Sequence, residues 1–383
     1  MIRSEFLPFG RPNISDAEID AVARVMRSGW IGMGQETIAF ERELAEYLGA
    51  PFVVTVNSCT SALFLSLLVL GIKPGDEVAC PSLTWCATAN AALYLGAKPV
   101  FCDVDPDTLN LTPESVAPKL TPRTRAVVVV HFGGLAVDVD KLRMALPPTV
   151  AIVEDAAHAL GARFQNGRRV GSSGNLTCFS FYANKNVSTG EGGAVALSDA
   201  SIAERLRSMS QNALSSTAWK RYTSPNVLTA GLITQLGYKM NYTDLQSAIG
   251  RVQLARQDEL AAIRLTIARE YVRGLEGLVP PLHLQRDCTQ LSHSRHLFIV
   301  RVPKMGLRMN RNELLVALRE RNIGATIHYI PLHLMDLYRD KSPTAALPVT
   351  DQIAETILTL PISASMSPGD AKFVTTELIG LLT

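Results

Sequence analysis

The sequence lacks an excess of charge of either sign and has no long apolar run. It contains 37 Lys and Arg residues against 35 Asp and Glu residues, a net charge of +2. Such a balance gives no indication of nucleic acid or an anionic membrane as a partner. No window approaches the roughly 18 uninterrupted apolar residues of a membrane span, and the opening MIRSEFLPFG has no apolar core of signal-peptide length. We therefore expect a cytoplasmic protein.

Cysteine is scarce and is not arranged in pairs. The six cysteines include no Cys-x-x-Cys spacing, and most lie in apolar segments such as VACP and VFCDV. Buried, reduced thiols are favoured here over disulfides or metal ligands, in keeping with the cytoplasm. No metal site is expected.

Apolar residues, in contrast, make up 47% of the 383 residues, which is enough for a large core. Between about residues 50 and 200, short β-type runs alternate with helical patterns. Near-continuous apolar strands separated by helices predict a mostly parallel sheet covered on both faces. The seven runs are FVVTV (52–56), EVACP (77–81), KPVFCDV (98–104), AVVVVHF (126–132), VAIVED (150–155), LTCFSFY (176–182) and GGAVALS (192–198).

The pattern changes toward the C-terminus. A long helical stretch starts after Thr243, which has Gln246 at the spacing of a capping box. Strand-like and helical segments then follow in an irregular order up to a final helix from Pro368. We therefore predict an α/β fold with a large domain over residues 1–250 and a smaller α+β domain over residues 251–383.

Polar side chains gather where the predicted strands end. Asp155 ends the fifth run and His158 follows it, Ser180 and Lys185 lie at the end of the sixth, and His131 ends the fourth. In parallel α/β sheets, ligands bind at the carboxyl ends of the strands, so these groups can meet at one edge. Each also has an ordinary explanation when taken singly, such as a helix cap for the aspartate or a solvated position for the lysine.

The first junction between a strand and a helix, VNSCTSALFLSL, is a candidate anion site. It places Ser58, Thr60 and Ser61 where free backbone N–H groups open a helix. The G-x-G-x-x-G spacing is absent, which disfavours a dinucleotide fold, and an ordinary cap explains the junction equally well. Trp85, just after the second run, is either a core residue or a surface on which a planar ligand stacks.

Together these groups meet the requirements of pyridoxal 5'-phosphate (PLP). This cofactor needs a lysine for a Schiff base, a carboxylate opposite its pyridinium nitrogen, a phosphate cradle and a ring to stack on. A lysine among apolar neighbours at a strand end has a lowered pKa, which suits imine exchange and proton transfer.

Six blocks along the chain resemble, in order and spacing, the DegT/StrS family of sugar aminotransferases. The resemblance runs from Phe6 to the last helix and implies a fold-type-I PLP-dependent transferase, similar to aspartate aminotransferase, in a homodimer with shared active sites. The opening SEFLPFGRP and the PSLTW block are most similar to the branch that aminates UDP-linked 4-keto-pentoses. The blocks are GWIGMGQETIAFERELAEYLGA, PGDEVACPSLTWCATANAALYLGAKPVFCDVDPDTLNL, VEDAAHALGA, FSFYANKNVSTGEGGAV, GYKMNYTDLQSAIGRVQL and HYIPLHLMDLYR.

The resemblance also implies roles for the residues around the cofactor ring. Lys185 would be the Schiff-base lysine and the acid–base catalyst. Asp155 would pair with the pyridine nitrogen, and His158 would contact the ring near its phenolic oxygen. Trp85 would stack on the ring face.

A second set of roles concerns the cofactor phosphate and the substrate. Thr60, Ser61 and Ser180 would hold the phosphate, and Asn241 would reach it from the neighbouring subunit. The segment with His328 and Tyr329 would border the channel of the nucleotide-sugar.

The implied reaction moves an amino group from L-glutamate to a keto-sugar on a nucleotide and releases 2-oxoglutarate. A 4-keto sugar is the first expectation. Two alternatives stay open. Sugar dehydratases of the same fold, which use PLP or its amine form PMP, carry histidine at the lysine position, so Lys185 argues against that class. A PLP-binding regulatory protein without turnover would keep the phosphate cradle but could lose the sugar pocket.

Overall fold

The computed structural model describes residues 3–214, 233, 235–286, 293–339 and 346–383. Its larger sheet has seven strands in the order β1-β7-β6-β5-β4-β2-β3. β7 runs antiparallel to both of its neighbours, and the other pairs are parallel. The predicted α/β class and the seven predicted runs are confirmed. The strands are β1 (Phe52–Val56), β2 (Glu77–Pro81), β3 (Lys98–Cys102), β4 (Thr124–Val130), β5 (Ala151–Asp155), β6 (Leu176–Ser180) and β7 (Gly193–Leu197).

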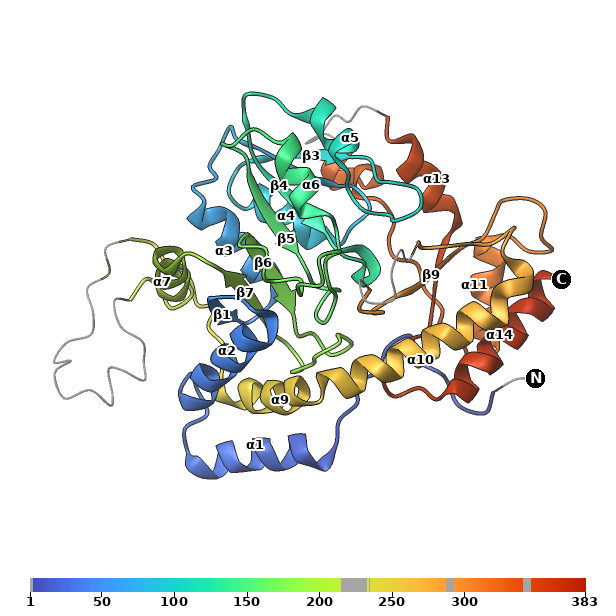
Figure 1. The fold of residues 1–383 in the computed structure, drawn as a ribbon, viewed down its shortest axis with the longest axis horizontal. Coiled ribbons are helices and arrows are strands. Elements are labelled where there is room, and N and C mark those ends of the chain that lie inside the picture. Colours follow the sequence, from blue (N-terminus) through green and yellow to red (C-terminus); the bar gives the residue numbers. More distant parts are fainter. Residues whose placement is uncertain (1–2, 215–232, 234, 287–292, 340–345) are drawn as a thin grey trace.

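Helices cover both faces of this sheet (Figure 1). Successive strand residues point to opposite faces, so Val53 joins one apolar cluster and Val54 the other. This burial on both sides explains why the strands read as continuous apolar runs. One face packs against α2 (Gln35–Leu48), α6 (Val139–Ala145) and α9 (Asp244–Ala255), and the other against α3 (Cys59–Val69), α4 (Cys86–Leu93) and α7 (Ala200–Met209).

The C-terminal segment builds a separate apolar cluster around a three-stranded antiparallel sheet, β10-β9-β8. Leu7 also belongs to this cluster, so the N-terminal strap crosses to it. The predicted boundary near residue 250 stays a prediction. The elements are β8 (His283–Leu284), β9 (Phe298–Arg301), β10 (Ile357–Leu360), α10 (Gln257–Leu275), α11 (Arg311–Glu320), α12 (Asp336–Arg339), α13 (Pro348–Thr356) and α14 (Pro368–Leu382).

Local signals in the sequence set several helix ends. α1 (Asp16–Ser28) begins with a capping box of Ser15 and Glu18 and ends at Gly29, whose φ of 75° is left-handed. Thr243 caps α9 by accepting a hydrogen bond from the backbone N–H of Gln246. The single helical stretch predicted after Thr243 is in fact two helices, because Arg256 adopts φ −95° and ψ 3° between α9 and α10.

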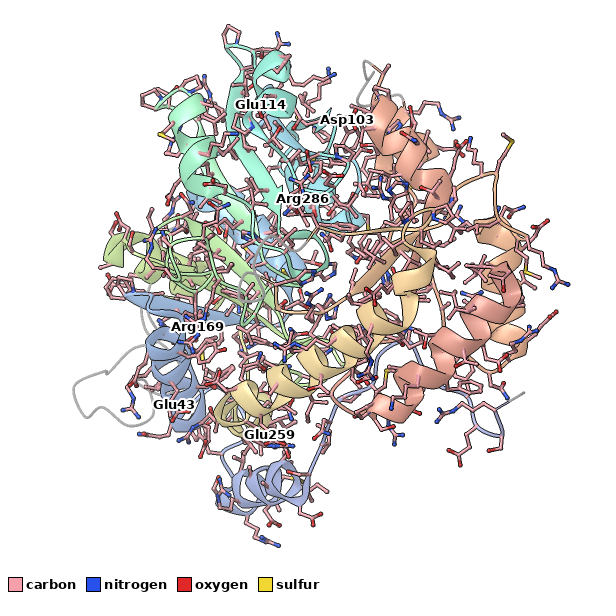
Figure 2. All side chains as sticks on the ribbon, turned by 45° about the vertical axis from the view of Figure 1, so that its right-hand side comes forward. Glu43, Asp103, Glu114, Arg169, Glu259 and Arg286 are labelled. Carbon is pink, nitrogen blue, oxygen red and sulfur yellow. The ribbon has the colours of Figure 1, made fainter. Side chains whose placement is uncertain are left out.

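Two contacts tie the C-terminal segment to the rim of the large sheet. Asp103, which follows β3, accepts hydrogen bonds from the backbone N–H and hydroxyl of Thr350 at 2.7 and 2.6 Å, at the start of α13 (Figure 2). Ser82, which follows β2, contacts Nδ1 of His333 at 2.6 Å and accepts from its backbone N–H at 3.0 Å. These contacts hold residues 328–333 against the carboxyl ends of the strands.

The cysteines agree with the prediction of reduced thiols. Cys59, Cys80, Cys86, Cys102 and Cys178 are all free and at least partly buried. The sixth, at position 288, lies outside the described residues. Within the described ranges, no helix is both long and apolar enough to cross a bilayer.

Candidate active site

A cavity of about 430 Å³ opens at the carboxyl ends of the large sheet. It is lined by residues from β4 to β6, from the loops after β1 and β2, and from the C-terminal segment. Segments far apart in the sequence therefore meet at one site. The predicted site residues among its lining are Thr60, Trp85, Asp155, His158, Ser180, Lys185, His328 and Tyr329.

Lys185 lies on a turn just beyond β6, where its backbone N–H donates to the carbonyl of Tyr182 at 2.9 Å. Its side chain is partly buried in the cavity. Removal from water lowers the pKa of its amine to about 8, although the nearby Cys59 and Asp155 act in the opposite direction. An appreciable share of neutral amine at neutral pH makes this lysine both a nucleophile and a base.

Asp155 is the last residue of β5 and is buried. One carboxylate oxygen accepts from the hydroxyl of Thr88 at 2.8 Å, and the other accepts from the backbone N–H of Ala157 at 3.2 Å. Burial raises the pKa of this carboxyl group, while the Thr88 and Ala157 hydrogen bonds and the charge of Lys185 oppose the rise. The carboxylate is thus held in a fixed direction beside the cavity.

The aromatic walls come from His158, Trp85 and Tyr329. Nε2 of His158 lies 3.1 Å from the Tyr329 hydroxyl, and burial holds the pKa of this imidazole well below its usual value. Trp85 is 60% exposed, and its ring centroid lies 5.8 Å from that of Tyr329. An exposed indole at a cavity mouth has a free face on which a planar ligand can stack.

The N-terminus of α3, which the sequence predicted as an anion cradle, lies at the edge of the cavity. The Ser58 side chain accepts from the backbone N–H of Ser61 at 3.1 Å, which caps the helix. Thr60 and Ser180 line the cavity beside it. A Cβ on Gly193 would lie 2.6 Å from the backbone nitrogen of Cys59, so only glycine lets β7 approach this helix end so closely.

Three residues that the sequence grouped with the site lie elsewhere. The hydroxyl of Ser61 donates to Asn57 at 2.6 Å, and this side chain does not line the cavity. Asn241 pairs with Val56 in an isolated bridge and is also absent from the lining. His131 is fully buried against Glu154 at 2.9 Å, so it does not join the cavity edge as the strand-end pattern indicated.

The sequence reading missed several groups that the structure brings in. Thr88 fixes Asp155, as described above. Asn184 and Glu191 line the cavity near Lys185, and their closeness in sequence to that lysine was a usable signal. His296 lies 3.5 Å from the lysine Nζ, but its position 111 residues further along the chain carried no such signal.

Two buried polar atoms in this lining have no hydrogen-bond partner among the residues that the structure describes. They are Nδ1 of His158 and Oδ1 of Asn184. Buried polar atoms are nearly always hydrogen-bonded, so both atoms point to a polar ligand. A pyridine ring with a phenolic oxygen and a phosphate fits the set of an orphaned imidazole nitrogen, a buried carboxylate, an amine and a capped helix end.

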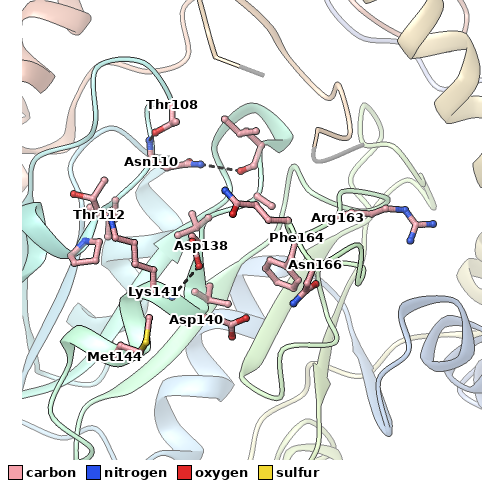
Figure 3. A pocket seen from close by; sticks show the side chains of 17 residues that line it. Thr108, Asn110, Thr112, Asp138, Asp140, Lys141, Met144, Arg163, Phe164 and Asn166 are labelled. Atoms are coloured by element: carbon pink, nitrogen blue, oxygen red, sulfur yellow. Dashed lines mark hydrogen bonds between the residues drawn. The ribbon is translucent and has the colours of Figure 1, made fainter. Parts of the chain in front are cut away.

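A second cavity, of about 550 Å³, lies beside α6 (Figure 3). Several of its polar side chains already have partners: Asp138 accepts from the backbone of Lys141 at 2.9 Å, and Asn110 donates to the carbonyl of Leu135 at 3.1 Å. Lys141 itself lies 3.6 Å from Glu114. Across the described ranges, no group of three or more His, Cys, Asp or Glu side chains is arranged to hold a metal ion.

Residues 12–379 match the model of the DegT/DnrJ/EryC1/StrS aminotransferase family. The chain belongs to this family. The resemblance noted from the sequence is thereby confirmed, and with it the fold-type-I architecture of PLP-dependent aminotransferases.

Individual relatives agree over nearly full length. The chain is 40% identical to the spore coat polysaccharide biosynthesis protein SpsC of Bacillus subtilis, over 96% of this chain and 95% of SpsC. The putative sugar aminotransferase Spr1654 of Streptococcus pneumoniae, solved in a PMP form, superposes with a TM-score of 0.90 at 30% identity and covers 98% of each chain. Its PLP form has a TM-score of 0.88 at 29% identity, over 99% of this chain and 100% of that one. PLP is thus confirmed as the cofactor predicted from the sequence.

A further solved relative carries a sugar. DesI, solved in the presence of its TDP-sugar product, superposes with a TM-score of 0.87 at 29% identity, over 98% of this chain and 93% of DesI. The family match and the sugar aminotransferases among these relatives support a PLP-dependent sugar aminotransferase.

Proposed function

We propose that this protein transfers an amino group from L-glutamate to a keto-sugar carried on a nucleotide, with a 4-keto sugar as the first candidate. The observation that carries the proposal is the convergence of Lys185, Asp155 and the unpartnered Nδ1 of His158 on one cavity. Lys185 argues against the sugar dehydratases, which carry histidine at this position. An open cavity with the exposed indole of Trp85 argues against a binding protein without turnover.

PLP supplies an electron sink for a carbanion when it is bound. Lys185 is the proposed covalent anchor and then the base that moves a proton, because its pKa of about 8 leaves it partly neutral. Asp155, held by Thr88, is the proposed counter-charge for the ring nitrogen. Nδ1 of His158 is proposed to donate to the phenolic oxygen, and Trp85 is proposed to stack on one ring face.

The cradle residues have a different task. Thr60, Ser180 and the first N–H groups of α3 are proposed to hold the phosphate, because a helix N-terminus carries partial positive charge. The hydroxyl of Ser61 is engaged by Asn57, so its proposed contribution is through its position in the capped turn. His328 and Tyr329 form the wall on the substrate side.

The nucleotide-linked substrate is supported by the TDP-sugar product of DesI. The name of SpsC supports a place in polysaccharide biosynthesis. The test below determines the nucleotide, the keto carbon and the face of the sugar. A UDP-linked 4-keto-pentose is the first candidate from the sequence.

The test loads the purified protein with PMP and offers UDP-, GDP- and TDP-linked 4-keto and 3-keto sugars. An amino-sugar in the mass spectrum, with return of the visible PLP absorbance, is the expected result. A deoxy-sugar without nitrogen would instead establish the dehydratase, and no turnover of any sugar would favour the regulatory class. L-Glutamate should reverse the absorbance change and release 2-oxoglutarate.

We further propose a homodimer in which Asn241 completes the partner's site, since this residue lies outside the cavity of its own chain. The test mixes and refolds Lys185→Ala with an Asn241 variant that is inactive alone. Random pairing makes about half of the dimers mixed, each with one intact site, so roughly a quarter of wild-type sites return. Background activity from a verified heterodimer would refute the shared site.

A further inference from the structure

Lys185 has a neighbour that the resemblance to the family did not assign. Nε2 of His296 lies 3.5 Å from the lysine Nζ, and His296 also lines the cavity. The imidazole is only 2% exposed, and its centroid lies 4.6 Å from that of His158. His296 is therefore buried beside Lys185, and its Nε2 is in contact with the lysine amine.

The hydrogen bonds behind this imidazole determine which nitrogen carries the proton. Asn186, which is buried, donates through Nδ2 to the carbonyls of Leu160 at 3.3 Å and Ser294 at 3.0 Å. Because both amide hydrogens are used, its Oδ1 must be the acceptor, and it faces Nδ1 of His296 at 3.2 Å. The proton of His296 thus lies on Nδ1, and the lone pair of Nε2 points toward Lys185.

The surroundings keep this imidazole neutral. Burial is the main cause that holds the pKa of His296 well below its usual value, and the charge of Lys185 acts in the same direction. A neutral imidazole with Nδ1 protonated can only accept at Nε2. The amine of Lys185 is a donor in both of its protonation states, so the pair is complementary.

We propose that His296 is a positioning residue for Lys185, and that its Nε2 accepts a hydrogen bond from the amine whenever the lysine is not attached to the cofactor. The inference rests on the proposed role of Lys185. It explains how a flexible four-carbon side chain stays at the reaction centre between the two half-reactions. Asn186, next to the lysine in sequence, fixes the tautomer that makes this possible.

Two conservative substitutions separate the two sides of the imidazole. His296→Gln places an amide near the position of Nε2, so it keeps an acceptor for Lys185. His296→Asn places its amide near the position of Nδ1, so it keeps a contact with Asn186 and loses the one with Lys185. The two variants are matched controls for each other, since both remove the ring.

The first readout is the titration of Lys185 in the full-length, cofactor-free protein. The rate of its acylation by acetic anhydride at each pH is followed by peptide mass spectrometry. An acceptor stabilises the ammonium, so its loss in His296→Asn should lower the apparent pKa of Lys185 by about one unit, while His296→Gln stays near the wild type. Other titratable or charged groups also face the lysine or His296, and they must be the same in all variants. These groups are Cys59, Asp155, His158, Glu191, Arg264, His328 and Tyr329.

The second readout uses the PLP-loaded protein. With L-glutamate, His296→Asn should slow the first half-reaction about tenfold, without changing the glutamate concentration that half-saturates it. His296→Gln should retain most of the rate. If His296→Asn does not fold, Asn186→Ala tests the same point, because the ring stays while its tautomer is no longer fixed, and a smaller downward shift is expected.

Equal behaviour of His296→Gln and His296→Asn would overturn the inference, whether both resemble the wild type or both fail. Borohydride trapping separates this outcome from a failure of the proposed function. A PLP adduct trapped on Lys185 keeps the proposed function and leaves only the role of His296 refuted. An adduct on another lysine, with full activity, refutes the function of Lys185 itself.

Discussion

Two cavities of this protein, one at the carboxyl ends of the large sheet and one beside α6, differ in a way that their volumes do not show. The cavity beside α6 is the larger, at about 550 Å³ against about 430 Å³. Its two aspartates, two asparagines and lysine are bonded to nearby backbone groups or held in ion pairs. The smaller cavity contains a lysine with a lowered pKa and two buried polar atoms that no described residue satisfies.

This difference indicates what makes a cavity a reaction site. Polar groups that are already bonded to their own chain gain little from a ligand. Unsatisfied buried groups carry a desolvation penalty that a complementary ligand removes, and shifted pKa values gather where chemistry is done. The smaller cavity has both features, so substitutions there should have large effects and those in the larger cavity should not.

The largest effect is expected from Lys185→Ala. Among the residues that the structure describes, no other lysine lines the cavity, so neither covalent attachment nor proton transfer should remain. We expect turnover at background, measured as 2-oxoglutarate formed from L-glutamate. Full activity would show that the shifted amine is not the chemical centre of this cavity.

Asp155→Asn should follow, with a loss of roughly 10²-fold or more in rate. The amide keeps the shape and a contact with Thr88 but removes the charge that is proposed to face the ring nitrogen. PLP should still bind through its phosphate, which the absorbance spectrum would report. Near-normal turnover would reduce Asp155 to a helix-capping residue.

Lys185→Met should stabilise the cofactor-free protein by about 2 kcal/mol at pH 7, after allowance for partial exposure. The folded pKa of about 8 lies below the usual 10.5, so burying the ammonium has a cost that is fully present below pH 8. Stability of the wild type should then rise between pH 8 and 10.5. Urea unfolding at pH 7 and pH 10.5 measures this, and an equal gain for Met at both values would point to packing instead.

A smaller effect is expected for Trp85→Leu, with PLP affinity about fivefold weaker. Stacking between aromatic rings contributes about 0.5–1.5 kcal/mol beyond buried area. Fluorescence titration of the cofactor-free protein with PLP measures the change. Unaltered affinity would mean that the exposed indole serves the substrate or a protein contact and not the ring.

The smallest effect is expected in the larger cavity. Met144 is 81% exposed in its lining, and Met144→Glu should leave turnover and PLP affinity within about twofold of the wild type. A loss as large as that of Trp85→Leu would show that the satisfied cavity also takes part, and would break the comparison.

Local sequence determined much of the secondary structure of this protein. Strand and helix limits followed from short-range signals such as the apolar runs, the capping box at Ser15 and the left-handed Gly29. These signals act between near neighbours in the chain, so they survive without tertiary context. The meeting of Lys185, Asp155 and the N-terminus of α3 at one cavity was also predicted, because the carboxyl ends of parallel strands meet at one edge.

Only the tertiary structure decided which polar groups are satisfied. His131 and His158 each follow a strand of the same sheet. His131 is bonded to Glu154, whereas Nδ1 of His158 has no hydrogen-bond partner among the described residues. His296 reaches Lys185 across 111 positions of the chain. Hydrogen bonds between distant segments depend on how the sheet, its loops and the C-terminal segment pack together, and no local pattern encodes that packing.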